Sequence, residues 1–210
     1  LLQNTISAML VVFLLMLLVG VLVNRKEGLA DLLEWVKSNK RILMAAELVF
    51  LAAFGLWAFI RALNPEIIGT EKPMELAFIN AILRSPTYPP ADPWLSGYSI
   101  SYYYFGYVMV AMLIKISGVV SGVGFNLDVA LWFGLTATAA CGLIFNLVSL
   151  WGRNGKAADN EPESKLPFFS ALLGPFFILL VSNLQGFLEM LHSRGVFWKQ
   201  AAAGTWQSTF

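Results

Sequence analysis

Two carboxylates four positions apart, Glu71 and Glu75, are the residues best placed in this sequence to do acid–base chemistry. Residues at this spacing share one face of a helix, so their negative charges raise each other's affinity for a proton, which is how a general base is tuned. Lys72 lies between them and could neutralise either one. The spacing leaves a second interpretation open, in which both are solvated residues of a first helical turn without chemistry.

A third carboxylate, Asp92, lies in a proline-rich stretch that runs from Tyr88 to Gly97 and includes Trp94. Each proline fixes its own φ angle and restrains the residue before it, so we expect Asp92 to be held in one conformation. Asp92 then either caps a turn, which is the simpler interpretation, or binds a cation or a substrate hydroxyl.

A cluster of four tyrosines lies a few residues after this stretch, at Tyr102, Tyr103, Tyr104 and Tyr107. Helical positions rotate by about 100° per residue, so three adjacent tyrosines cannot share one face, whereas Tyr103 and Tyr107 can. An aromatic belt at a membrane surface is one interpretation of these residues, and hydroxyl donors to a polar ligand are the other.

Few other polar groups invite a chemical interpretation. Glu47 lies within an apolar run, where a carboxylate is a functional candidate, but its nearness to Lys40 and Arg41 favours an interfacial role. Cys141 is the single cysteine, so it forms no intrachain disulfide, and we interpret it as inert packing. The sequence shows no metal-binding motif, phosphate-binding glycine loop or nucleophile elbow.

The elements that position these residues are membrane helices. The chain is 58% hydrophobic and 13% charged, with a mean hydropathy of +0.68, an apolar surplus too large for a soluble core. Its apolar runs of about 20 residues match helices that cross a ~30 Å hydrocarbon core. The sequence therefore predicts an all-α, polytopic transmembrane helical bundle in a single membrane domain. The five predicted spans cover residues 1–23, 41–63, 102–120, 126–151 and 167–190.

The loops between the spans set the expected orientation. The loop 24–40 is rich in lysine and arginine and has leucines at helical spacing near Trp35, so we expect a cytoplasmic amphipathic helix in the interface. The loop 64–101 is then external, and Thr70 is expected to cap a helix within it that lies along the outer membrane surface. The apolar stripe of that helix is Met74, Ala77, Phe78, Ala81 and Ile82.

The net charge and the ends of the chain indicate which partners to expect and how much of the protein is present. The formal net charge of +1 gives no basic field, so nucleic acid is not an expected partner, whereas membrane lipids are. The chain begins and ends without the signals of a complete protein and reads as a piece of a longer one. We expect it in the plasma membrane of a prokaryotic cell.

Four motifs occur in an order that resembles a known family. They are Arg61-Ala-Leu-Asn-Pro-Glu66, Glu71-Lys-Pro-Met-Glu75, Pro89-Pro-Ala-Asp-Pro-Trp94 and Tyr102-Tyr-Tyr-Phe-Gly-Tyr107. Over about residues 41–190 the chain resembles the uncharacterised prokaryotic "YYY" membrane-protein family, named for its triple tyrosine. That family is distantly similar to the GT-C glycosyltransferases, multi-span enzymes that take sugars from polyprenyl-phosphate carriers on the outer membrane face.

The resemblance implies roles for particular residues. Glu75 matches the catalytic carboxylate in the first external loop of GT-C enzymes, although the family most often carries Asp there, which is one methylene shorter. Glu71 or Asp92 would assist it or hold a divalent cation, Mg²⁺ or Mn²⁺. Arg84 or Lys72 would steady the phosphate leaving group. The expected substrate-binding side chains are Lys72, Arg84, Trp94, Tyr103 and Tyr107.

Three functions remain open at this point. The leading hypothesis is a glycosyltransferase-like protein that acts on a lipid-phosphate-linked sugar at the outer membrane face. The alternative is a non-catalytic subunit or scaffold that docks partner subunits through residues 64–107. The third hypothesis is a transporter. A transport pathway normally needs several buried polar groups within the spans, and here only Glu47 is a fair candidate for such a group.

Overall fold

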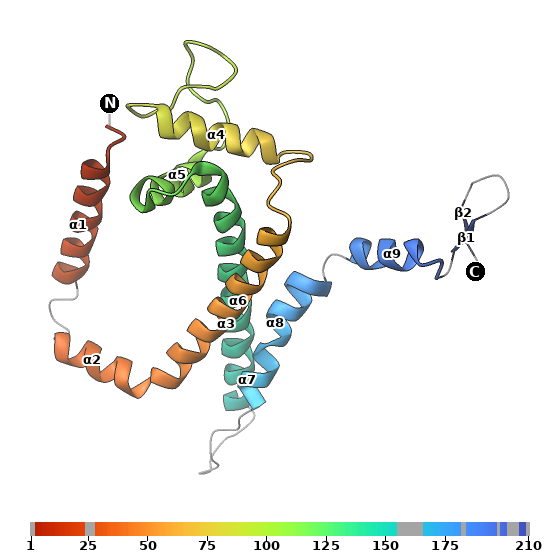
Figure 1. Cartoon of the computed structure of the whole chain (residues 1–210). Helices are drawn as coiled ribbons and strands as arrows, with labels where there is room; N and C mark the ends of the chain where they lie inside the picture. Colours follow the sequence, from red (N-terminus) through yellow and green to blue (C-terminus); the bar gives the residue numbers. More distant parts are fainter. Residues whose placement is uncertain are drawn as a thin grey trace. The chain divides into compact units, whose positions relative to one another are not determined.

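A computed structural model describes residues 3–23, 28–154, 166–181, 184–196, 198–200 and 206–208 (Figure 1). Helices form most of the described structure, which confirms the predicted helical, polytopic fold class. They are α1 (Ile6–Val23), α2 (Leu29–Ser38), α3 (Lys40–Leu63), α4 (Lys72–Arg84), α5 (Phe105–Ser117), α6 (Ser121–Asn154), α7 (Leu166–Ala171), α8 (Leu173–Pro175), the π-helix η2 (Phe176–Val181) and α9 (Leu184–Ser193). The chain forms two compact units, Leu1–Gly134 and Leu135–Phe210.

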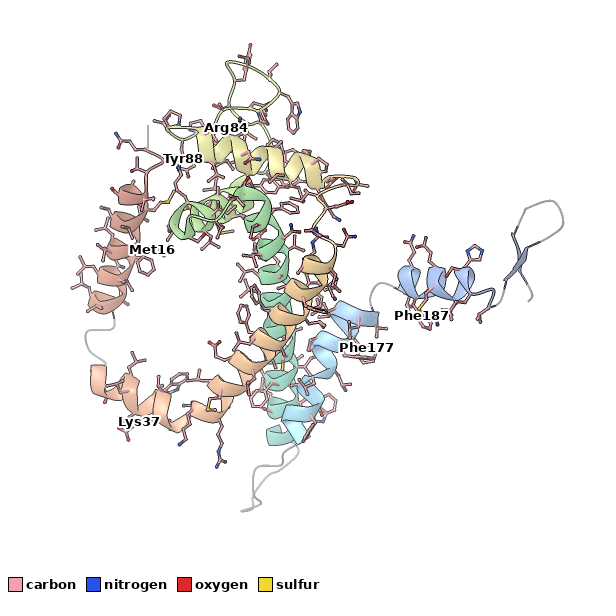
Figure 2. The ribbon with its side chains drawn as sticks, viewed as in Figure 1. Met16, Lys37, Arg84, Tyr88, Phe177 and Phe187 are labelled. Carbon is pink, nitrogen blue, oxygen red and sulfur yellow. The ribbon has the colours of Figure 1, made fainter. Side chains whose placement is uncertain are left out.

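Three of the described helices are long and apolar enough to cross a membrane, namely α1, α3 and the Ser121–Trp151 part of α6. Their large apolar side chains are exposed on the protein, as residues solvated by lipid must be. Met16 on α1 is an example, at 69% exposed (Figure 2). The helical pair Phe169–Val181 and Leu184–Ser193, bent by 54°, is a candidate fourth span.

The segment predicted as the span 102–120 forms a shorter helix. α5 has 13 residues and, at 1.5 Å per residue, a length of about 20 Å, less than the ~30 Å of a hydrocarbon core. It ends at Gly118, whose φ of 71° suits a residue without a Cβ atom. The apolar face of α5, with Val110, Ala111 and Ile114, is buried within the protein.

The core of the first unit lies between α4 and α5, which pack against each other (Figure 1). α4 contributes Phe78, Ala81 and Ile82 of its predicted stripe, together with Ile79, which is 1% exposed. The stripe therefore faces protein. It does not lie along a lipid surface as expected from the sequence, because α5 is folded beneath it.

The start of α1 is joined to this core through Asn4, which is 5% exposed. Its side-chain amide donates hydrogen bonds to the carbonyl oxygens of Ile82, at 2.6 Å, and Ser85, at 2.8 Å. Its side-chain oxygen accepts one from the Tyr88 hydroxyl at 3.1 Å, and its backbone oxygen accepts one from Lys115 Nζ at 2.8 Å. Burial lowers the pKa of the Lys115 ammonium group. Asn4 thus supplies side-chain donors to two carbonyls at the end of α4, and one of them, that of Ile82, also accepts from the Ser85 amide.

A ring pair and a polar pair are among the contacts that join α3 to the first part of α6. Trp57 and Phe133 stack with centroids 4.4 Å apart. Arg61 Nε donates a 2.7 Å hydrogen bond to Asn126 Oδ1, and Asn126 Nδ2 donates to the Pro65 carbonyl at 3.1 Å. These contacts fix the rotation of α6 about its axis next to the candidate site.

The second unit has a tight helix contact and a short hairpin. A Cβ atom on Gly174 would lie 2.6 Å from the backbone oxygen of Ala140, so α8 approaches α6 closely at this point. The strands β1 (Trp198–Gln200) and β2 (Trp206–Ser208) pair in an antiparallel register that places Lys199 opposite Gln207.

Candidate functional site

Glu75 is placed by the first turn of α4. The helix begins at Lys72 with Pro73 in its first turn, a position where proline costs no backbone hydrogen bond. Glu71 is the N-cap residue, and its carbonyl accepts a 2.9 Å hydrogen bond from the Glu75 amide. The sequence predicted Thr70 as the N-cap residue, but Thr70 lies one position before the observed N-cap. Glu71 is exposed, whereas Glu75 is half-buried and faces a cavity.

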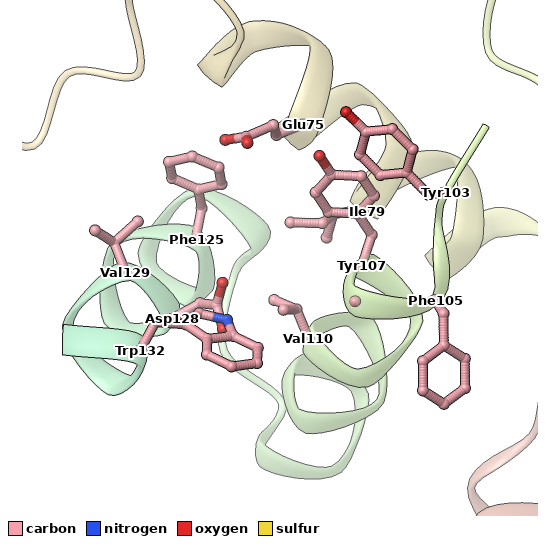
Figure 3. A pocket seen from close by; sticks show the side chains of 11 residues that line it. Glu75, Ile79, Tyr103, Phe105, Tyr107, Val110, Phe125, Asp128, Val129 and Trp132 are labelled. Atoms are coloured by element: carbon pink, nitrogen blue, oxygen red, sulfur yellow. The ribbon is translucent and has the colours of Figure 1, made fainter. Parts of the chain in front are cut away.

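The cavity has a volume of about 460 Å³ and lies within the first unit (Figure 3). Its walls come from α4, from the tyrosine segment before α5, from the first part of α5 and from the first part of α6. Its polar side chains are two carboxylates, two phenols and one indole. The lining residues are Glu75, Ile79, Tyr103, Phe105, Gly106, Tyr107, Val110, Phe125, Asp128, Val129 and Trp132.

Tyr107 and Glu75 face each other across one side of the cavity (Figure 3). The Tyr107 hydroxyl is hydrogen-bonded to the Glu75 carboxylate. Burial raises the pKa of the Tyr107 hydroxyl, and the neighbouring charge of Glu75 raises this pKa further. At neutral pH the phenol is therefore a proton donor, which orients the carboxylate of Glu75.

Asp128 is the second carboxylate of the cavity and was missed in the sequence analysis. It lies on α6, seven positions after Ser121, and so about 10 Å along the helix. The Trp132 indole nitrogen, one turn further on, donates a hydrogen bond to it. The rule that singled out Glu47, an acidic residue inside an apolar run, would have found Asp128 as well. Glu47 itself is exposed on α3 and does not line the cavity.

The triple tyrosine lies ahead of α5, which begins at Phe105. The helical rotation argument therefore does not apply to Tyr102 and Tyr103, although Tyr103 and Tyr107 do line the same cavity. The Tyr102 hydroxyl donates a 2.5 Å hydrogen bond to that of Tyr103, and this bond raises the pKa of Tyr102 to about 12. Tyr104 is the N-cap residue of α5.

Asp92 and Trp94 belong to a turn outside the cavity lining. Asp92 Oδ1 accepts hydrogen bonds from the backbone amides of Trp94, at 2.8 Å, and Leu95, at 2.9 Å. This is the turn-capping role that the sequence favoured for Asp92. The Trp94 ring meets Phe78 edge-on, with centroids 5.2 Å apart, and so attaches the turn to α4.

The two predicted phosphate-binding residues also lie outside the lining. Lys72 is the first residue of α4 and is exposed. Arg84 is in the last turn, where its Nε donates a 3.2 Å hydrogen bond to the Asn80 carbonyl (Figure 2). Among the described residues that line the cavity there is no lysine or arginine.

Glu75 and Asp128 supply oxygen ligands of the kind that Mg²⁺ and Mn²⁺ prefer. Across the described part of the chain, no group of three or more acidic, histidine or cysteine side chains could hold a metal ion. Two carboxylates fit a cation that is completed by water and substrate oxygens, which is the usual coordination of Mg²⁺.

The fold and this site define a helical integral membrane protein with a carboxylate-lined cavity formed by α4, α5 and the first part of α6. The chain belongs to the DUF2298 family of uncharacterized membrane proteins, whose model matches residues 1–209. No match was found among curated proteins or among solved structures. The similarity to GT-C glycosyltransferases and the plasma-membrane location remain predictions from the sequence.

Proposed function

We propose that this protein is a glycosyltransferase-like enzyme that uses a lipid-phosphate-linked sugar, with Glu75 as the general base. The observation that carries the proposal is the cavity in which Glu75, bound by Tyr107, faces the same space as Asp128. A positioned carboxylate in a partly enclosed site is what proton abstraction from an acceptor hydroxyl requires.

The position of the cavity along the chain supports this proposal. α3 ends at Leu63 and α6 begins at Ser121, so if both helices cross the bilayer, residues 64–120 lie on one side of it. Asp128 is then about 10 Å below the first residue of α6, near the level of lipid headgroups. The phosphate of a lipid carrier resides at this depth.

The reaction is a substitution at the anomeric carbon of the sugar. The acceptor oxygen forms a bond to that carbon while the bond from the carbon to the phosphate oxygen breaks. Glu75 takes the acceptor proton, and the electron pair leaves with the lipid phosphate. Lys72 or Arg84, the two cationic side chains of α4 outside the cavity lining, is proposed to steady the charge on the leaving phosphate.

The test uses the full-length protein in membranes supplied with a polyprenyl-phosphate sugar. Glu75→Gln keeps the shape of the side chain and removes its basicity, so sugar transfer should fall by about 100-fold or more. The matched control is Glu66→Gln, because Glu66 is exposed in the same segment and does not line the cavity. Transfer that is equal in wild type and Glu75→Gln would exclude Glu75 as the base.

A further inference from the structure

The cavity walls carry an unbalanced negative charge. Glu75 and Asp128 are its acidic side chains, and the described lining residues include no lysine or arginine to offset them. A phosphate in this space would meet two carboxylates, whereas a cation would be attracted by both. The electrostatics of the lining therefore favour a cationic group.

The remaining walls also suit a cation. Aromatic residues contribute five of the lining residues, and the face of an aromatic ring attracts ammonium groups that lie within about 6 Å. The Phe105 ring is turned away from the cavity (Figure 3), so the rings that face it belong to Tyr103, Tyr107, Phe125 and Trp132. Because the rings and the aliphatic residues exclude water on several sides, charge pairing in the cavity is stronger than in bulk solvent.

The two carboxylates have different partners. The Glu75 carboxylate is hydrogen-bonded to the Tyr107 hydroxyl, and the Asp128 carboxylate is hydrogen-bonded to the Trp132 indole one helical turn away (Figure 3). A carboxylate has about four lone-pair sites, so one indole donor leaves Asp128 free to accept from a ligand. An ammonium group, with three donors, matches this capacity.

We propose that the acceptor bound in this cavity is an amino sugar, with its ammonium group held by Asp128 beside the hydroxyl whose proton Glu75 takes. The inference rests on the proposed function and adds the class of acceptor. It also assigns Asp128 and Trp132 to ligand binding and places the donor phosphate outside the carboxylate-lined space.

The experiment compares D-glucosamine with D-glucose, which differ in one ammonium group in place of one hydroxyl. Each sugar is titrated into the full-length protein in lipid nanodiscs at matched ionic strength, and binding is measured as the shift of the thermal unfolding midpoint. Glucosamine should bind about tenfold or more tightly than glucose, since a desolvated hydrogen bond to a charged group outweighs a neutral one. Equal affinities would overturn the inference.

Variants identify the residue responsible. Asp128→Asn should abolish the preference for glucosamine over glucose, and Asp128→Glu should restore the preference. Asp92→Asn is the control, because it removes a carboxylate outside the cavity and still caps the turn. A preference that survives in Asp128→Asn would refute the role of Asp128.

The outcomes separate the two proposals. Glucose binding without a preference for glucosamine overturns the amino-sugar inference and leaves the proposed function standing. If neither sugar shifts the midpoint of wild type beyond the shift seen with sucrose at the same concentration, both proposals fail. Sucrose is excluded from protein surfaces and therefore accounts for the general stabilisation that sugars give by exclusion.

Discussion

The hydroxyl of Tyr107 on α5 is hydrogen-bonded to the carboxylate of Glu75 on α4. The two residues belong to different sequence motifs that are far apart in the chain. The packing of α4 on α5 brings them together. Tyr107 orients the carboxylate toward the cavity and favours its ionised form, which is the form that can act as a base.

Tyr107→Phe should therefore lower the rate of sugar transfer by about tenfold, because one hydrogen bond to a charged group is lost while the ring remains. The measurement is kcat in the membrane assay described above, with Tyr98→Phe as the control, since Tyr98 is exposed in the proline-rich loop. An unchanged kcat in Tyr107→Phe would show that the phenol does not support the base.

Asn4→Ala should destabilise the protein by about 2 kcal/mol, because the carbonyl groups of Ile82 and Ser85 each lose the buried side-chain donor of Asn4. The free energy of unfolding in detergent checks this, with Gln3→Ala as the control at an exposed neighbour. A loss no greater than that of Gln3→Ala would mean that water replaces Asn4 at no cost.

Arg61 and Asn126 should show a coupling energy of about 1 kcal/mol in a double-mutant cycle. The cycle uses Arg61→Ala, Asn126→Ala and the double variant, and it measures the free energy of unfolding. The 2.7 Å contact predicts that the double variant is less destabilised than the sum of the single ones. Strict additivity would contradict a direct contribution of this contact to stability.

Gly174→Ala should destabilise the second unit by about 1–3 kcal/mol, because the added methyl group would lie 2.6 Å from the Ala140 backbone oxygen. Gly142→Ala is the matched control. Nothing lies within 4 Å of its added Cβ atom, and alanine favours helix over glycine. Thermal unfolding should show opposite shifts for the two variants, and equal shifts would contradict the close contact.

Stability should fall as pH rises above 10.0, the ordinary pKa of tyrosine. The pKa values of Tyr88 and Tyr107 are raised by burial, and that of Tyr102 is raised to about 12 by its bond to Tyr103. The folded state keeps these protons where the unfolded chain loses them, so each raised pKa contributes stability that is complete below 10.0 and lost above it.

The near-ultraviolet absorbance of tyrosinate follows this titration. In wild type one tyrosine hydroxyl should ionise at a pH well above that of the others. Tyr103→Phe should move this ionisation step toward pH 10.0, because Tyr102 loses its hydrogen-bond partner. A high-pH step that persists in Tyr103→Phe would rule out the Tyr102–Tyr103 bond as its cause.

The sequence by itself determined the helical membrane class, the limits of α3 within about one residue of the predicted span, and the helix that carries Glu75. These features depend on local properties: an apolar run long enough to cross lipid, and a proline and a carboxylate suited to a first helical turn. The turn-capping role of Asp92 was predictable for the same reason, because its hydrogen-bond partners lie within three residues of it in the chain.

Only the tertiary structure decided which polar residues meet. Asp128 joins Glu75 through the packing of α6 beside α4 and α5, whereas Glu71, Lys72, Arg84 and Asp92 lie outside the cavity although they are closer to Glu75 in sequence. The physical reason is the direction in which each side chain points. Neighbouring side chains on a helix point in different directions, and the packing of distant helices decides which side chain faces the cavity. The motif that contains Glu75 therefore predicted a segment that lines the cavity, whereas the packing of the helices determined which residues share the cavity with Glu75.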